Sequence, residues 1–217
     1  MDNYRYLLFD LDGTLTDSAE GIINCVNHAM TTLGYDIPER PERFLGPPLY
    51  DSFAEFCGLN EEQVLEAVRI YRERYRTTGL FENSVYDGVR EMLGRLEEGG
   101  KELFVATSKP ETFAVRILEK FELAGYFRII GGADINGTRN EKWEVIDYVL
   151  DKAGITSKEN VLMIGDRKHD IIGAHRSGLK CLGTLWGYGT VEELTGYGAD
   201  FLAATPREAA DMLLGTI

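Results

Sequence analysis

The chain places two carboxylates directly after a short apolar run near its start. Tyr6-Leu7-Leu8-Phe9 is typical of a short buried strand, and Asp10 and Asp12 follow it at spacing i, i+2. Gly13 then allows a sharp turn. In an open α/β sheet, ligands bind just outside the carboxyl ends of the strands. Two acids at such a position repel each other unless a bound cation balances their charge or one of them is protonated. The stretch therefore indicates either a functional site or a solvated Asp-x-Asp-Gly turn.

Downstream of residue 84 the sequence alternates between apolar strands and helices. We expect strands over residues 103–106, 128–130, 161–164, 181–185 and 200–202. We expect helices over residues 89–98, 111–121, 143–153, 171–177 and 206–214, with Pro110 in the first turn of the second of these. Such alternation predicts an α/β fold whose doubly wound, Rossmann-like parallel sheet is covered by helices on both faces.

A long helical segment interrupts this pattern after the first strand. Asp17 is expected to cap a first helix, which Gly34 ends. Apolar residues at helical spacing recur over residues 49–57 and 61–76, and no strand is expected between these helices. We therefore predict a small, all-helical cap domain over residues 17–83. It is inserted into a core domain made of residues 1–16 and 84–217.

Charge and cysteine content restrict the partners and the compartment. The formal net charge of −13 argues against a nucleic-acid or anionic-membrane partner. Cys25, Cys57 and Cys181 are scattered and odd in number, which favours a reducing cytoplasm over a disulfide framework or a zinc site. We see no signal-peptide pattern and no run approaching the roughly 20 apolar residues of a membrane span. The sequence predicts a cytoplasmic protein and does not distinguish a monomer from a homodimer.

Polar side chains follow three of the predicted strands. Asp10 and Asp12 end the first, Thr107 and Ser108 end another, and Asp166 and Asp170 follow a third. Each residue alone is weak support for a site, because Ser, Thr and Asp often cap helices. Together they are expected to converge on one crevice at the carboxyl ends of the strands.

The order of these motifs resembles that of the haloacid dehalogenase (HAD) superfamily. The shared pattern is Asp10-x-Asp12-Gly-Thr, a hydrophobic strand ending in Thr107-Ser108, a lysine, and Gly-Asp166-x-x-x-Asp170. The position of the helical insert resembles the branch with a small helical cap. That branch includes phosphoglycolate phosphatases, 5'-nucleotidases, β-phosphoglucomutase, phosphonoacetaldehyde hydrolase and the dehalogenases.

This resemblance implies a role for each motif residue. Asp10 is expected to attack phosphorus and form an aspartyl phosphate, and Asp12 to act as general acid and then as general base. Asp10, the backbone carbonyl of Asp12 and Asp166 would offer an all-oxygen ligand set, which suits Mg²⁺. Asp170 would lie behind these ligands and orient water or a lysine.

Thr107, Ser108, Lys109 and the start of the following helix would hold the phosphate oxygens. For the lysine that neutralises Asp10 and the phosphate, two candidates remain: Lys142, which its position before a helix favours, and Lys109, which directly follows Ser108. Arg43 precedes a rigid Phe-Leu-Gly-Pro-Pro segment of the cap and is a candidate substrate contact.

The activities found in the helical-cap branch require different residues, and some of these are absent from this chain. Dehalogenases normally lack the second acid of the Asp-x-Asp pair, which is present here as Asp12. Phosphonoacetaldehyde hydrolysis needs a cap lysine, and the first lysine of the chain is Lys101, beyond the cap. A phosphosugar mutase and a non-catalytic binding protein stay open. The prediction is a Mg²⁺-dependent phosphatase for a small soluble phosphate ester, either a phosphoglycolate-like acid or a nucleoside 5'-monophosphate.

Overall fold

The computed structural model describes residues 1–134 and 139–217. The chain divides into two compact units, one made of Met1–Thr16 with Val85–Ile217 and the other of Asp17–Ser84. We call them the sheet unit and the inserted unit. Within the described residues, no helix combines the length and the apolar character needed to cross a bilayer.

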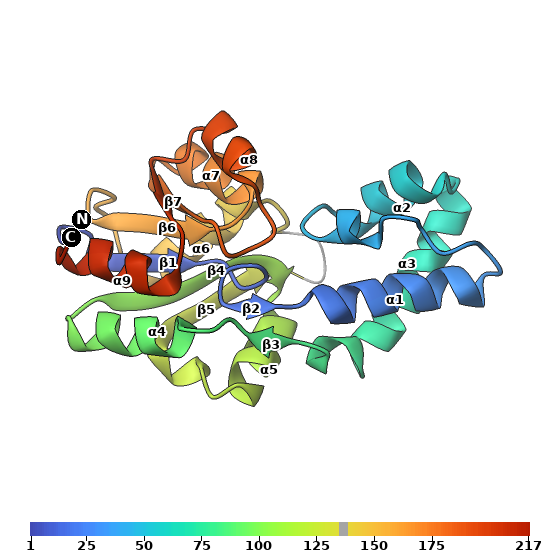
Figure 1. Cartoon of the computed structure of the whole chain (residues 1–217), viewed down its shortest axis with the longest axis horizontal. Helices are drawn as coiled ribbons and strands as arrows, with labels where there is room; N and C mark the ends of the chain where they lie inside the picture. Colours follow the sequence, from blue (N-terminus) through green and yellow to red (C-terminus); the bar gives the residue numbers. More distant parts are fainter. Residues whose placement is uncertain (135–138) are drawn as a thin grey trace. The chain divides into compact units, whose positions relative to one another are not determined.

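A six-stranded, parallel sheet forms the centre of the sheet unit (Figure 1). In spatial order its strands are β5 (Phe127–Ala133), β4 (Glu102–Pro110), β1 (Tyr6–Phe9), β6 (Val161–Gly165), β7 (Lys180–Thr184) and β8 (Phe201–Ala203). The chain lays down β1, β4 and β5 toward one edge and β6, β7 and β8 toward the other. The order therefore reverses between β1 and β6, where doubly wound sheets bind their ligands. The predicted fold class is confirmed.

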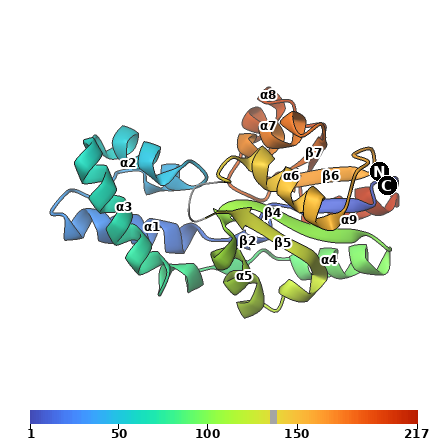
Figure 2. The ribbon, with the colours of Figure 1, turned by 180° about the vertical axis from the view of Figure 1, so that it is seen from behind.

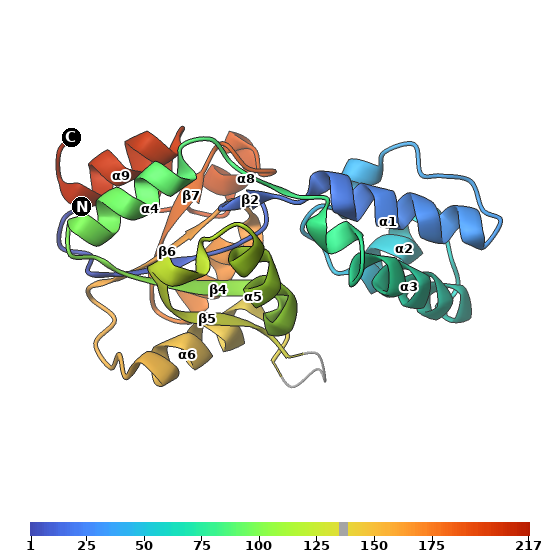
Figure 3. The ribbon, with the colours of Figure 1, turned by 90° about the horizontal axis from the view of Figure 1, so that it is seen from below.

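Helices cover both faces of this sheet. One face carries α4 (Val89–Glu98), α5 (Glu111–Lys120) and α9 (Pro206–Leu214), with α4 and α9 side by side (Figure 3). The other face carries α6 (Lys142–Ala153), α7 (Lys168–Arg176) and α8 (Val191–Gly196), as seen from behind in Figure 2. A short 3-10 turn, η3 (Ala124–Tyr126), precedes β5.

The core under α6 and α7 holds β1 and β6 together. Leu8 and Met163 from these strands are buried with Val149 of α6 and Ile171 of α7. Burying such side chains contributes about 1.5–3 kcal/mol each, which makes the sheet a rigid base for the residues at its carboxyl end.

The inserted unit is helical. Its elements are α1 (Ala19–Thr32), η1 (Pro41–Phe44), α2 (Leu49–Cys57), α3 (Glu61–Tyr75) and η2 (Gly79–Phe81). Phe44 packs edge-on against Phe53 and Phe56, with ring centroids 5.0 and 5.6 Å away. The short strands β2 (Thr16–Asp17) and β3 (Ser84–Val85), which connect to this unit along the chain, pair as a separate two-stranded sheet.

Helix ends differ in detail from the sequence expectations. Ser18, not Asp17, is the N-cap of α1, although the Asp17 carboxylate accepts the Ala19 N–H at 3.0 Å. Gly34 follows the end of α1 with a φ of +76°, as its role as a helix stop requires. Pro110 is the N-cap of α5 and not a residue of its first turn.

Three elements differ more strongly. α7 begins at Lys168, three residues before the expected start, because Asp170 accepts the Arg167 N–H and closes the first turn. β4 continues through Pro110 with an irregular register after Ala106. α8 was not expected, because six residues are too few for a readable helical period.

Candidate active site

Strand β1 delivers Asp10 to the point where the sheet order reverses. Phe9 lies beside Val105 of β4 and Ile164 of β6, so the next residue reaches the carboxyl ends of both neighbours. The Asp10 N–H donates to the Ile164 carbonyl at 2.9 Å, which fixes its backbone. The Asp10 side chain is 13% exposed, so its charge is largely removed from water.

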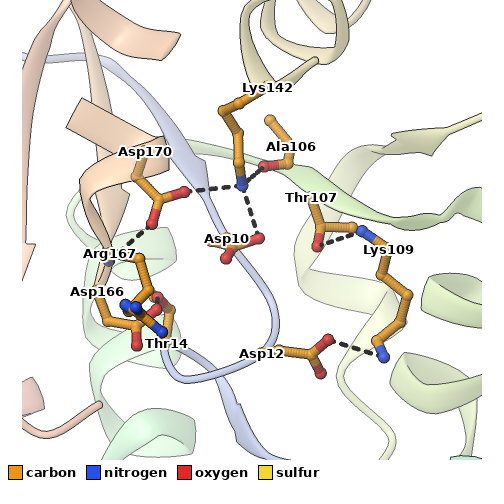
Figure 4. A network of polar contacts seen from close by, with 10 residues as sticks. All are labelled: Asp10, Asp12, Thr14, Ala106, Thr107, Lys109, Lys142, Asp166, Arg167 and Asp170. Carbon is orange, nitrogen blue, oxygen red and sulfur yellow. Dashed lines mark hydrogen bonds and ion pairs between the residues drawn. The ribbon is translucent and has the colours of Figure 1, made fainter. Parts of the chain in front are cut away.

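Lys142 provides the positive charge for this carboxylate. From the start of α6, its Nζ lies 2.9 Å from Asp10 Oδ1 and 2.8 Å from Asp170 Oδ1, and it donates to the Ala106 carbonyl at 3.1 Å (Figure 4). Burial alone would lower the pKa of Lys142, but the two carboxylates raise it above the usual range. Lys142 is therefore a permanent cation here, and the structure brings it, rather than Lys109, to Asp10.

Asp170 lies on the far side of Lys142 from Asp10. Burial raises the pKa of Asp170 to about 6, although Lys142 and the Arg167 N–H stabilise its ionised form. At neutral pH the group is thus an anion that contacts the lysine. The role expected for Asp170, orienting water or a lysine, stays a prediction.

Asp166 is fully buried at the end of β6. The Tyr188 N–H donates to its Oδ2 at 2.7 Å, and the Thr14 hydroxyl lies 3.4 Å from its Oδ1. Burial raises the pKa of Asp166 well above its ordinary value, and the neighbouring charges of Asp170 and Asp10 raise it further. The ionised form of this carboxyl is stable only with additional positive charge.

A divalent cation fits that requirement. Asp10, Asp166 and Asp170 each offer a carboxylate oxygen, and these oxygens lie within 4.8 Å of one another. Hard oxygen donors of this kind suit Mg²⁺ or Ca²⁺ rather than zinc, which prefers nitrogen and sulfur. Asp10 and Asp166 are thus close enough to share one ion, while Asp170 is also engaged by Lys142.

The charge balance at Asp166 leads to a testable consequence for stability. The folded-state pKa of Asp166 lies above its unfolded value, so its ionisation near pH 7 costs the folded protein free energy when no metal is bound. Asp166→Asn removes this cost. We expect metal-free Asp166→Asn to melt higher than the metal-free wild type, by about 2–4 °C for each kcal/mol recovered.

Mg²⁺ should raise the melting temperature of the wild type but not that of Asp166→Asn. Thermal unfolding with and without Mg²⁺ measures both effects. Asp151→Asn, at an exposed site on α6, is the matched control and should behave as the wild type. Two results would contradict the proposed charge repulsion at Asp166. One is a metal-free Asp166→Asn that melts lower than the metal-free wild type, and the other is a Mg²⁺-induced rise in its melting temperature as large as that of the wild type.

The end of β4 supplies the remaining predicted residues. Thr107 is buried, with 2% exposure, whereas the Ser108 side chain is exposed. The Lys109 Nζ lies 2.7 Å from Asp12 Oδ2 (Figure 4). Lys109 thus pairs with the second acid of the Asp-x-Asp motif, and Lys142 with the first.

A loop after β7 encloses Asp166, and sequence reasoning missed it. The Trp186 Nε1–H donates to the Thr14 carbonyl at 3.0 Å. A Cβ on Gly187 would lie 2.2 Å from the Gly13 carbonyl oxygen, and one on Gly13 would lie 2.2 Å from Asp166 Oδ2. Only residues without a side chain fit at these two points. The signal that could have revealed the loop is the Trp-Gly-Tyr-Gly run directly after a predicted strand.

Arg43 belongs to the inserted unit. Its guanidinium pairs with Glu55 at 3.2 Å and lies over the Phe56 ring, 3.8 Å from the centroid. The side chain is 50% exposed. A substrate contact for Arg43 stays a prediction.

Comparisons with known proteins identify the family of the chain. A family model described as haloacid dehalogenase-like hydrolase matches residues 7–184. A 5'-nucleotidase from Pseudomonas aeruginosa is 47% identical over 207 residues, which is 92% of this chain and 93% of that protein. Tyrosine-protein kinase PtkA from Mycobacterium tuberculosis is 38% identical over 190 residues, which is 87% of this chain but 64% of that protein.

A solved structure shows the same architecture over the whole chain. The crystal structure of a predicted phosphatase from Clostridium acetobutylicum has a TM-score of 0.90 at 40% identity, covering 98% of this chain and 99% of that one. The sequence resemblance is therefore confirmed. The chain belongs to the haloacid dehalogenase-like hydrolases and is an enzyme of the phosphatase type.

Proposed function

We propose that the protein is a Mg²⁺-dependent phosphatase for a small soluble phosphate monoester. The observation that carries the proposal is the position of Asp10, with its carboxylate 2.9 Å from Lys142 Nζ and within 4.8 Å of oxygens from Asp166 and Asp170. A nucleophile that must approach an anionic phosphate needs such concentrated positive charge, from the lysine and from a metal held by the acids.

In this proposal, Asp10 attacks the phosphorus atom, and the bond from phosphorus to the ester oxygen breaks. The departing oxygen takes a proton from Asp12. Asp12 then accepts a proton from the water that attacks the aspartyl phosphate, which releases inorganic phosphate and restores Asp10.

Asp10, the Asp12 backbone carbonyl and Asp166 would hold the metal, which when bound neutralises the phosphate charge. Thr107 and Ser108 would bind phosphate oxygens, with help from the start of α5. Thr107 and Ser108 follow the part of β4 that pairs with the end of β1, the strand that presents Asp10, and this position supports the role.

For the substrate, we propose a nucleoside 5'-monophosphate or a short phosphorylated acid of the phosphoglycolate type. The 47% identity to a 5'-nucleotidase favours the nucleotide. We further propose that the inserted unit acts as a cap that excludes water, with Arg43 reaching the substrate and hinges near residues 15–18 and 83–86. We also propose a cytoplasmic location, which the three free cysteines support, and a monomer or homodimer.

Two alternatives are less well supported. A phosphosugar mutase would have to protect its aspartyl phosphate from water, and no described feature favours such protection. A non-catalytic binding protein would not need Asp10, Asp12, Thr107 and Asp166 together, and all are present. Both alternatives predict little net hydrolysis.

The test is a panel of phosphate esters measured with and without Mg²⁺. Nucleoside 5'-monophosphates, phosphoglycolate, hexose phosphates and an aryl phosphate should be compared by kcat/KM. We expect Mg²⁺-dependent phosphate release, highest for one of the first two classes. Absence of hydrolysis at every metal concentration would refute the proposal. Conversion of a hexose phosphate into its isomer without phosphate release would establish the mutase.

A further inference from the structure

The pair formed by Lys109 and Asp12 is separate from the cluster around Lys142. In Figure 4, Lys142 lies between Asp10 and Asp170, while Lys109 approaches the Asp12 carboxylate from the end of β4. The Lys109 side chain is 6% exposed and the Asp12 side chain 23%, and Lys109 Nζ lies 2.7 Å from Asp12 Oδ2. Because the lysine is almost completely buried, the ion pair is only partly screened by solvent and has a defined geometry.

The backbone of β4 is fixed at this lysine. The Lys109 N–H donates to the Thr107 hydroxyl at 3.2 Å. On the other side, a Cβ on Gly132 would lie 2.5 Å from the Lys109 carbonyl oxygen, so β5 packs directly against this peptide. Pro110 follows and restricts the chain further. The ammonium group is therefore presented from a constrained strand end and not from a flexible loop.

The two oxygens of the Asp12 carboxylate differ in their surroundings. Oδ2 is held by Lys109, whereas Oδ1 is buried and has no hydrogen-bond partner among the described residues. A buried acceptor without a partner costs free energy, so such atoms commonly serve a function. An acid anchored through one oxygen keeps the other for proton transfer.

We infer that Lys109 is a positioning residue for Asp12 and not a phosphate ligand. The inference rests on the proposed function, in which Asp12 protonates the departing oxygen. If Lys109 acts through Asp12, its loss should harm only those substrates whose leaving group needs a proton. If Lys109 instead binds the phosphate, its loss should harm all phosphate esters equally.

The experiment compares Lys109→Met with the wild type on esters of graded leaving-group pKa. Dinitrophenyl, nitrophenyl, phenyl and alkyl phosphates form such a series, and kcat/KM reports the steps up to departure of the leaving group. For the alkyl ester we expect a fall on the order of 100-fold, and for the dinitrophenyl ester less than about threefold, because general acid catalysis is worth 10²–10⁴-fold only where a proton is needed.

Two further variants separate position from charge. Lys109→Arg keeps a cation and should recover part of the alkyl-ester activity. Lys120→Met, an exposed lysine at the end of α5, removes the same charge without contact to Asp12 and should leave the whole series unchanged.

A double-variant test addresses the pair itself. In an Asp12→Asn background, adding Lys109→Met should change kcat/KM for phenyl phosphate little, because the residue through which the lysine acts is already lost. Equal losses across the ester series, or a full additional loss in the Asp12→Asn background, would overturn the inference while leaving the phosphatase proposal intact. A wild-type protein that hydrolyses none of the esters would instead remove the proposed function, and the inference with it.

Discussion

Asp10→Asn is expected to abolish turnover of phosphate esters while leaving the fold intact. The amide has nearly the same shape as the carboxylate but lacks the charge and nucleophilicity needed to attack phosphorus. Losing the nucleophile should lower kcat on the order of 10³-fold or more. The measurement is phosphate release, together with circular dichroism to verify folding.

The proposed aspartyl phosphate gives this variant a second, independent readout. Wild-type protein quenched during turnover should carry a phosphoryl group on the peptide that contains Asp10, and Asp10→Asn should carry none. Asp10→Glu, which keeps the charge but shifts the oxygen by one methylene group, should also lose most activity, since proximity supplies much of the rate. Comparable turnover by Asp10→Asn would remove the nucleophile assignment.

Lys142→Met is expected to lower both activity and stability. The lysine side chain is 5% exposed and contacts two carboxylates, so its loss leaves Asp10 and Asp170 without their cation in a buried site. Breaking a buried pair in this way costs about 3–5 kcal/mol of unfolding free energy. Loss of charge stabilisation near the phosphate should lower kcat by about 10²–10³-fold.

The stability loss from Lys142→Met should depend on pH. The folded-state pKa of Asp170, about 6, lies above its unfolded value, so the folded state favours protonated Asp170 more strongly than the unfolded state does. In the wild type, the free-energy cost of ionising Asp170 is absent below the unfolded pKa, grows as the pH rises toward 6 and is constant above it. Removing Lys142 raises the folded-state pKa further, so the additional loss of the variant accumulates above pH 6 and the difference from the wild type should be larger at pH 8 than at pH 5.

Urea unfolding of the Lys142→Met and wild-type proteins at the two pH values, without divalent metal, measures this difference. Lys158→Met is the matched control: its side chain is 44% exposed, lies 3.6 Å from Asp147 and donates to the Ser177 carbonyl at 2.8 Å. Its loss should be small and equal at the two pH values. An equal loss of stability at pH 5 and pH 8 would show that the packing of the lysine stem, and not its charge, is responsible.

Much of the fold follows from local patterns. α4 and α9 match the expected residue ranges, because each has a clear apolar stripe and a glycine just past its end. The first strands of the sheet were readable as apolar runs. By contrast, β4 runs four residues past its apolar part into the polar Thr107–Pro110 segment, where pairing with β5 and not side-chain character keeps the chain extended.

The acids of the site were predictable because strand ends converge in a sheet of this topology. The groups that form hydrogen bonds and ion pairs with these acids were harder to predict. The Tyr188 N–H that binds Asp166 is a backbone group, which leaves no trace in the identity of the residue. Lys142 was favoured by its position before a helix. The pairing of Lys109 with Asp12 was not predicted, and it follows an irregular register after Ala106 that no local pattern encodes.

The division of the chain has a consequence for how such enzymes diversify. Two groups of residues come from Met1–Thr16 and Val85–Ile217, and none of them from the continuous stretch Asp17–Ser84. They are the acidic cluster with Lys142, and the Asp12–Lys109 pair with the threonine at the end of β4. One uninterrupted piece of gene can therefore be replaced without altering any of these groups. If this stretch is the cap proposed above, exchanging it between relatives should transfer substrate preference and leave the residues of the sheet unit unchanged.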